Sequence, residues 1–104
     1  MKREIKFRVW DKVDYMSSPF TLQDVQNGKI KFTPDCPIML FTGLRDRNGK
    51  EIYEGDIIDY GHGRFRPVEF IDGAFCILKI NSMPSLMTLY AVVGNIYDNP
   101  ELLS

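Results

Sequence analysis

The chain has 104 residues, a formal net charge of −1 at pH 7 and 44% hydrophobic residues. A chain of this size and composition is expected to fold as one domain, residues 1–104, around a core of its own. The near-neutral charge gives no general attraction to nucleic acid or to anionic membranes. Because the apolar runs are too short to span a bilayer and the N-terminus lacks the apolar region of a signal peptide, we expect a cytoplasmic protein with no membrane partner.

The N-terminal residues predict an amphipathic strand. Apolar and polar side chains alternate over residues 4–10, which indicates a half-buried strand whose polar face carries Lys6 and Arg8. Trp10 falls on the same polar face and is expected at a rim, where its indole N–H can find a partner. A turn then leads to a short strand around Tyr15.

Asn27-Gly28 is the strongest hairpin signal in the chain, because both residues tolerate the positive φ of a tight two-residue turn. It follows a break at residues 17–19 and lies between residues 20–26 and 29–32. We expect these two segments to be the paired strands of a β-hairpin. Residues 33–37 then form a loop.

The middle of the chain predicts three strands separated by two turns. The apolar run at residues 38–42 indicates a central strand, and an Asn-Gly turn at 46–49 returns the chain through residues 50–53. Residues 54–56 mark a corner that leads into a strand at 57–60. The charged side chains of the turn are expected to be solvated at a hairpin tip.

The remaining elements are a turn at 61–63, strands at 68–70 and 75–80, one or two strands within 86–96, and a single helical turn at 99–103. Turn signals recur about every 8–12 residues, a spacing typical of β-sandwiches and barrels. The sequence therefore predicts a compact, strongly bent all-β domain with many short hairpins. Its second half has the strand-and-turn rhythm of SH3-like barrels.

Several of these segments together resemble the YopX family of phage and prophage proteins. The resemblance lies in residues 41–44 and 46–57, in the N-terminal strand at 5–10, and in the C-terminal segments 93–97 and 99–103. It implies an all-β pseudobarrel or sandwich built from two strongly bent antiparallel sheets, and an origin in a phage or prophage acting in a bacterial host cell. The resemblance implies no catalytic residues, and it assigns no biochemical role.

The acidic and cysteine residues do not predict an active site. Glu51, Glu54, Asp56 and Asp59 are interpreted as surface charges, with Asp56 also forming the turn after a glycine. The acidic segment 46–51 fails as a calcium loop, because its glycine comes too early for the ligand spacing. Two cysteines far apart in the sequence, Cys36 and Cys76, are expected to be buried free thiols. We expect no metal, cofactor or catalytic group.

One loop carries the chemistry of a binding site. Residues 60–66 place two arginines and an aromatic ring beside flexible glycines, an arrangement that can follow a phosphate backbone while a base stacks on the ring. A second basic hairpin tip would extend this surface if it lay nearby. The alternative is that the arginines keep an exposed hairpin edge soluble, with the ring turned inward. The candidate contact residues are Arg45, Arg47, Lys50, His62, Arg64, Phe65 and Arg66.

Three classes of function remain for this chain. The first is a non-catalytic binding or assembly protein that contacts another protein or a second copy of itself, with Trp10, Tyr15 and Tyr90 as candidate interface aromatics in addition to the phenylalanine of the basic loop. The alternative is an accessory nucleic-acid-binding protein that uses the basic loops. An enzyme would need a pocket that holds two or more of Asp56, Asp59, Glu69 and His62. The protein partner is favoured.

Overall fold

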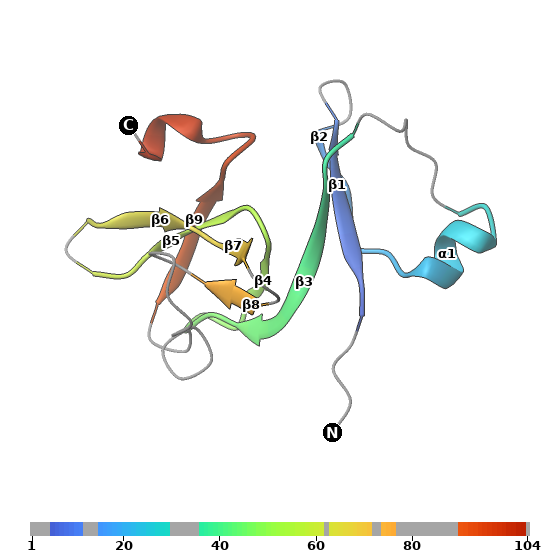
Figure 1. The fold of residues 1–104 in the computed structure, drawn as a ribbon, viewed down its shortest axis with the longest axis horizontal. Coiled ribbons are helices and arrows are strands. Elements are labelled where there is room, and N and C mark those ends of the chain that lie inside the picture. Colours follow the sequence, from blue (N-terminus) through green and yellow to red (C-terminus); the bar gives the residue numbers. More distant parts are fainter. Residues whose placement is uncertain are drawn as a thin grey trace.

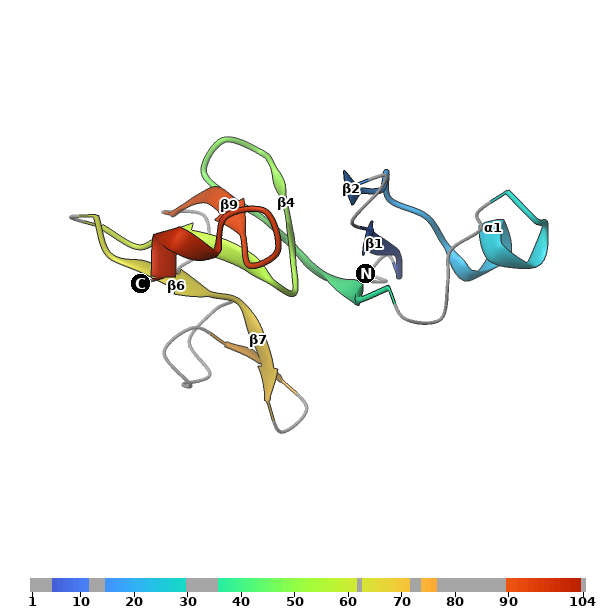
Figure 2. The same ribbon diagram turned by 90° about the horizontal axis from the view of Figure 1, so that it is seen from above.

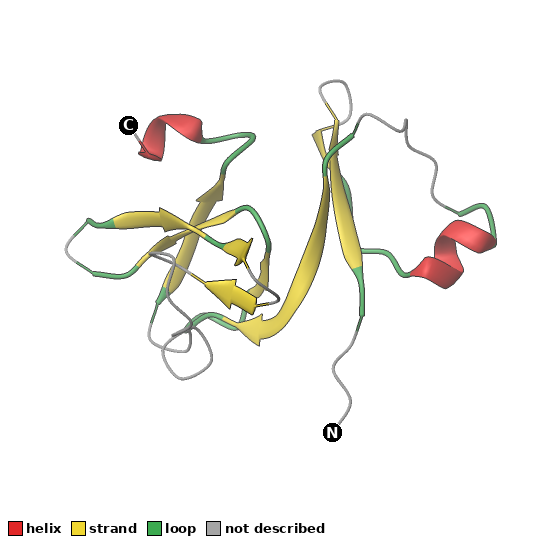
Figure 3. Ribbon diagram, viewed as in Figure 1, coloured by secondary structure: helices red, strands yellow, loops and turns green. Residues whose placement is uncertain are grey.

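The computed structural model describes residues 5–11, 15–29, 36–61, 63–71, 74–76 and 90–103. Antiparallel strands dominate these residues, with one short α-helix and a terminal 3₁₀-helix (Figure 3). The elements in chain order are β1 (Phe7–Asp11), β2 (Tyr15–Met16), α1 (Leu22–Gln26), β3 (Ile38–Arg45), β4 (Glu51–Tyr53), β5 (Asp56–Asp59), β6 (Phe65–Pro67), β7 (Glu69–Ile71), β8 (Ala74–Cys76), β9 (Ala91–Asn95) and η2 (Pro100–Leu103).

The predicted all-β architecture is confirmed. The described strands form a four-stranded sheet of order β2-β1-β3-β4, a three-stranded sheet of order β6-β5-β9, and the hairpin β7-β8. Every pairing is antiparallel, and none of these sheets closes on itself. The bent sheets therefore form an open arrangement and not a closed barrel.

Strand β3 connects the two halves of the molecule. It is long and bent, and β1, β2 and α1 lie to one side of it while β5, β6, β9 and η2 lie to the other (Figures 1 and 2). Its first residues pair with β1, and its second half pairs with β4 at Phe41 and at Arg45, with a shift of register between these two positions. Such an irregularity bends a strand and increases its twist. The bend brings the β4–β5 corner back toward β1.

The corner between β4 and β5 is where the sheets join. Gly55 adopts a φ of +88°, a left-handed conformation that favours glycine. Its backbone N–H donates to the carbonyl of Val68 at 2.9 Å, and its own carbonyl accepts from the N–H of Ile96 at 2.9 Å. The predicted glycine corner is thus a junction of three segments that are far apart in the sequence.

Two apolar clusters form the core on either side of this corner. One contains the buried residues Ile52, Ile58 and Val68, and the other contains Met39, Phe41 and Tyr53. Full burial of such a side chain contributes about 1.5–3 kcal/mol relative to leaving it exposed. The core therefore lies around β4 and β5, and the segment 41–57 with the most distinctive sequence pattern supplies half of these residues.

The hairpin predicted at Asn27-Gly28 is wrong. The structure has helix α1 instead, and Asn27 takes a φ of −83° while Gly28, at +73°, follows the helix. Thr21 caps the helix, because its hydroxyl accepts from the Asp24 N–H at 3.2 Å and the Asp24 carboxylate accepts from the Thr21 N–H at 2.9 Å. This reciprocal cap outweighs the turn signal, which ends a helix here. Residues 30–32 of the predicted second strand lie outside the described residues.

Two other local predictions agree with the structure. The short strand around Tyr15 is β2, and the single helical turn at the C-terminal end is η2, with Pro100 at its first position. Cys36 is outside any disulfide, as predicted, but it is half-buried and not buried, and its thiol donates to the Asp11 carboxylate at 3.6 Å. The side chain of Cys76 is outside what the structure describes. Within the described residues, no helix is long and apolar enough to cross a membrane.

Candidate functional site

A buried ion pair connects the two halves of the molecule. The guanidinium of Arg8 on β1 pairs with the carboxylate of Asp56 on β5, which is 1% exposed. Asp56 also accepts from the Tyr53 N–H at 2.7 Å, and Arg8 lies 4.6 Å from the centroid of the Tyr53 ring. The interpretation of Asp56 as a surface charge is therefore wrong, and Arg8, which the sequence places on the polar face of its strand, is buried as well. The bend in β3 is the reason, because it covers the polar face of β1 with the β4–β5 corner.

Burial affects both members of this pair. Burial raises the pKa of Asp56 above its ordinary value, although the Arg8 charge and the Tyr53 N–H act in the opposite direction. No described residue accepts a hydrogen bond from the buried Nε of Arg8. Both features show that burying the pair costs free energy. Removal of either residue would leave the other as a buried charge without a partner.

A second ion pair lies beside the first. Lys6 pairs with Glu51 on β4 and also lies 4.9 Å from the centroid of the Phe41 ring. Burial would raise the pKa of Glu51, but the Lys6 ammonium and the Tyr53 hydroxyl, which donates to Glu51 at 3.1 Å, hold the pKa below its usual value. Glu51, predicted as a surface charge, is therefore half-buried in a contact between β1 and β4.

Asp46 joins the β3–β4 turn to strand β9. It is 5% exposed, and its Oδ1 accepts from the N–H groups of Asn48 and Lys50 at 2.8 and 2.9 Å. Its Oδ2 accepts from the N–H of Val92 at 2.9 Å. The prediction that the charges of this turn are solvated is wrong for Asp46. Its carboxylate instead holds the turn against β9, because it accepts from a residue that lies 46 positions later in the sequence.

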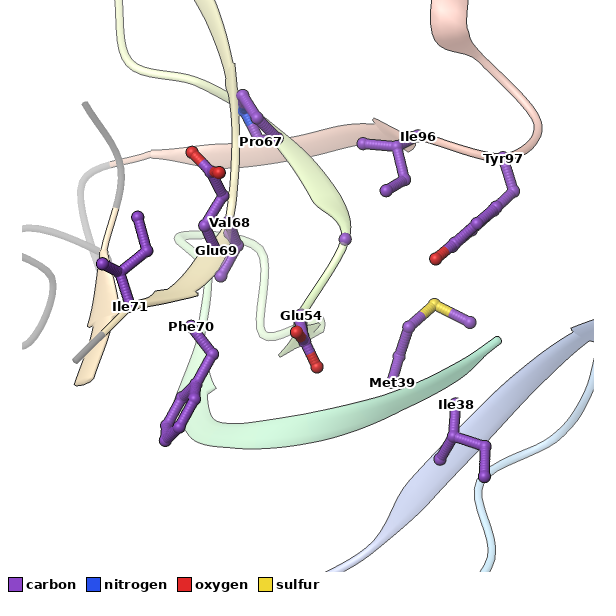
Figure 4. A pocket seen from close by; sticks show the side chains of 11 residues that line it. Ile38, Met39, Glu54, Pro67, Val68, Glu69, Phe70, Ile71, Ile96 and Tyr97 are labelled. Carbon is purple, nitrogen blue, oxygen red and sulfur yellow. The ribbon is translucent and has the colours of Figure 1, made fainter. Parts of the chain in front are cut away.

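A pocket of about 290 Å³ opens between β3, the β4–β5 corner and β7, and we call it the central pocket (Figure 4). Its wall is mostly apolar, and Ile38 and Phe70 at its edges are 51% and 48% exposed. Two half-buried carboxylates also line it, and neither has an ion-pair partner among the described residues. The lining residues are Ile38, Met39, Glu54, Gly55, Pro67, Val68, Glu69, Phe70, Ile71, Ile96 and Tyr97.

Tyr97 and Trp10 support one wall of the central pocket. The Trp10 ring stacks on the Tyr97 ring with centroids 5.5 Å apart, and its indole N–H donates to Asp98 at 2.7 Å. Burial and the negative charge of Glu54 raise the pKa of the Tyr97 hydroxyl. Trp10, which the sequence places at a rim, therefore packs on Tyr97, and Tyr97 lines the central pocket. Its role at an interface stays a prediction.

The basic candidate residues lie at one end of the sheet β6-β5-β9. Arg45, Arg47 and Lys50 are exposed around the β3–β4 turn, and Arg64 and Arg66 are exposed at the start of β6. The N–H of Arg47 donates to the carbonyl of Tyr90 at 2.9 Å, just before β9, and the N–H of Tyr60 donates to Arg64 at 3.0 Å, just after β5. Since Asp59 of β5 pairs with Ala91 of β9, both hairpin ends flank the same sheet end. We call these five cations and Phe65 the basic end.

The remaining candidates have simpler placements. Phe65 is half-buried and pairs with Asp59 across the β5–β6 hairpin. Tyr90 is half-buried beside Tyr60, in an edge-to-face contact with centroids 6.3 Å apart. His62 and the side chain of Tyr15 lie outside what the structure describes. Of the carboxylates considered for catalysis, Asp59 accepts from the Gly61 N–H at 2.9 Å, Asp56 is paired with Arg8, and Glu69 lines the central pocket.

The family assignment follows from a sequence comparison with known families. The model of the family described as YopX protein matches residues 6–104. The chain belongs to the YopX family. The match includes both ion pairs, the Asp46 contact, the central pocket and the basic end, so all of these features lie within the YopX domain. The comparison with curated proteins gives no match.

A solved structure has the same fold as this YopX chain. The crystal structure of protein EF1440 from Enterococcus faecalis is similar over 99% of this chain and 100% of that chain, with a TM-score of 0.64 and 24% sequence identity. At this identity the likeness supports the fold alone. The functional argument therefore depends on the geometry of the sites described above.

Sequence reasoning missed the central pocket completely. Its walls come from β3, the β4–β5 corner, β7 and the segment after β9, and no local pattern links these segments. One signal was present, since Phe70 follows Glu69 on a short strand where alternation requires one of the two to face outward. Without the neighbouring strands, the exposed phenylalanine could not be connected to a site.

Proposed function

We propose that this protein is a non-catalytic binding or assembly protein of phage or prophage origin, which holds an apolar, positively charged segment of a partner protein in the central pocket. The observation that carries the proposal is an open apolar pocket with exposed Ile38 and Phe70 at its edges. Interfaces concentrate their binding energy in a few aromatic and apolar anchors that fill such pockets. The pocket volume of about 290 Å³ suits one or two side chains.

The charge of the pocket specifies the partner. Glu54 and Glu69 both line it, and neither has an ion-pair partner among the described residues. A carboxylate beside an apolar surface favours a lysine or arginine, whose aliphatic stem packs on apolar groups while its charge meets the carboxylate. A basic segment of a protein partner is therefore the occupant that this surface fits best.

The placement of the acidic residues supports a binding role over a catalytic one. Paired catalytic carboxylates need to lie together in environments that separate their pKa values. Here Asp56 is engaged by Arg8, and Asp59 closes the turn at Gly61. Glu69 lies in the central pocket, apart from both of these contacts. The three carboxylates thus serve an ion pair, a turn and a pocket wall.

The test compares partner capture by the tagged full chain and by pocket variants from nuclease-treated host cells. The wild-type chain is expected to recover a partner in stoichiometric amount, measured by quantitative mass spectrometry. Phe70→Ser, Glu54→Lys and Glu69→Lys are each expected to weaken binding of that purified partner by about tenfold or more, because each removes an anchor or reverses a charge. Calorimetric titration with the purified partner measures the change.

Leu22→Ser is the matched control, since Leu22 is an exposed apolar residue on α1, outside the central pocket. It is expected to leave partner binding unchanged. Recovery of a strict monomer with no associated protein would count against the proposal. A partner that Phe70→Ser and both glutamate variants still bind at the wild-type affinity would place the interface elsewhere and reject the pocket.

A further inference from the structure

We propose that the basic end binds the phosphate backbone of single-stranded nucleic acid, at a site separate from the central pocket. Its two hairpin ends lie close to each other. Arg47 is joined to Tyr90 by a backbone hydrogen bond, and Arg64 is joined in the same way to Tyr60. Tyr60 and Tyr90 contact each other edge to face. The two hairpin ends therefore lie next to each other across β5 and β9, although they are separate in the sequence.

Three acidic groups near these hairpin ends are already engaged by internal donors. Asp46 accepts from three backbone N–H groups, and Asp59 accepts from the Gly61 N–H. Glu51 is engaged by Lys6 and also accepts from Arg45 at 3.3 Å. These internal contacts satisfy the carboxylates, while Arg47, Lys50, Arg64 and Arg66 have no ion-pair partner among the described residues. These four exposed cations are the ones available to phosphate oxygens.

A groove beside the cations offers room for a base. It has a volume of about 460 Å³ and lies between the β5–β6 hairpin and η2, with Arg64, Phe65, Arg66 and Leu102 in its wall. This volume is within the range of about 300–1,000 Å³ that is typical of small-molecule sites. A half-buried aromatic ring next to two guanidinium groups is the combination that single-strand binders use, with stacking on the ring and phosphates on the arginines.

The net charge of −1 predicts how this binding behaves. The whole molecule has no excess of positive charge, so affinity must come from the local contacts of the basic end. Such contacts release counterions, and the logarithm of the association constant falls by about 0.7 per single-strand phosphate for each unit rise in the logarithm of salt concentration. We therefore expect binding that is measurable at low salt and weakens steeply as salt increases.

The experiment measures fluorescence anisotropy of labelled oligo-dT and oligo-U of about 12 nucleotides, with a duplex of the same length, over a series of salt concentrations. Arg64→Ala/Arg66→Ala and Arg47→Ala/Lys50→Ala are each expected to reduce the salt slope by about 0.7–1.4 and to weaken binding about tenfold or more at low salt. Phe65→Leu is expected to weaken binding about fivefold with an unchanged slope, because it removes stacking and no charge.

Lys29→Ala is the matched control. Lys29 is an exposed cation whose N–H donates to the carbonyl of Asp24 in α1 at 3.0 Å, and α1 lies on the other side of β3 from β6 (Figure 1). Its substitution removes one positive charge, as does each single substitution in the basic end. It is expected to leave both the affinity and the slope unchanged. Urea unfolding of every variant verifies that the fold is intact. Comparison of the DNA and RNA arms shows which single strand the site prefers.

Three results would overturn the proposal. These are the absence of binding to either single strand at low salt, an equal loss of binding on Lys29→Ala, and tighter binding of the duplex than of the single strands. None of these results affects the central pocket, because neither double variant changes a residue that lines it. Failure of this inference and failure of the proposed protein partner are thus distinguishable.

Discussion

Asp56→Ala is expected to lower the free energy of unfolding by about 3–5 kcal/mol, the usual effect of breaking a buried ion pair. The substitution leaves the guanidinium of Arg8 buried without its counter-charge, and the Nε of that guanidinium already has no acceptor among the described residues. It also removes the acceptor of the Tyr53 N–H. Urea unfolding followed by circular dichroism measures the change. A loss of this size would remove a large part of the stability of a small domain.

A double-mutant cycle separates the ion pair from the other contacts of the carboxylate. Arg8→Met combined with Asp56→Ala is expected to cost less than the sum of the two single substitutions, because the unpaired charge disappears with its partner. The remaining cost is the unpaired Tyr53 N–H. Effects that add to within about 0.5 kcal/mol would show that the two charges are not coupled. Glu54→Ala, a half-buried carboxylate without an ion-pair partner among the described residues, serves as the control and is expected to be near neutral.

Asp46→Ala is expected to lower the free energy of unfolding by about 3 kcal/mol, since the carboxylate accepts three backbone hydrogen bonds and a hydrogen bond has a net contribution of about 1 kcal/mol. The matched control is Asp59→Ala, which removes the same group from a turn where it accepts one such bond, from Gly61. That variant is expected to lose about 1 kcal/mol. Equal losses in the two variants would contradict the role of Asp46 in joining the turn to β9.

The pH dependence of the Asp46 variant tests the same contact independently. Burial would raise the pKa of Asp46, but the N–H groups of Val92, Lys50 and Asn48 outweigh burial and hold the pKa below its ordinary value of 3.8. A carboxyl group whose pKa is lower in the folded state contributes stability that is complete above the unfolded pKa and disappears as pH falls through the folded one. The stability gap between wild type and Asp46→Ala should therefore be constant above about pH 5 and narrow below about 3.8. A gap that stays constant down to pH 2 would contradict the lowered pKa.

The strands were largely predictable because their signals are local. Alternation over residues 4–10, the apolar run at 38–42 and the Asn-Gly turn at 46–49 each act on neighbouring residues only, and β1, β3 and β4 follow from them. The helix α1 was also locally encoded, by the cap between Thr21 and Asp24, but a competing turn signal directly after it suggested a hairpin. The error was to give the turn signal more weight than the helix cap.

The two candidate sites differ in how much of each could be predicted from the sequence. The cations and the phenylalanine of the basic end were recognisable as residue types, but their position on one surface depends on β9 lying between the two hairpins. The central pocket had no comparable sequence signal, because its wall combines segments from both ends of the chain. Sequence patterns identify a site only when its residues share an element or a motif.

By itself, the sequence determined most of the strands, most of the turns and the family, all of which depend on residues close together along the chain. Only the tertiary structure decided which charges face water. Arg8 and Asp56 are 48 residues apart, and Asp46 and Val92 are 46 apart, so their burial depends on how β3 bends and where β9 pairs. A charge is buried when another strand covers it with a matching donor or acceptor. That condition is a property of the assembled fold, and so is the central pocket, whose wall combines β3, β7 and the segment after β9.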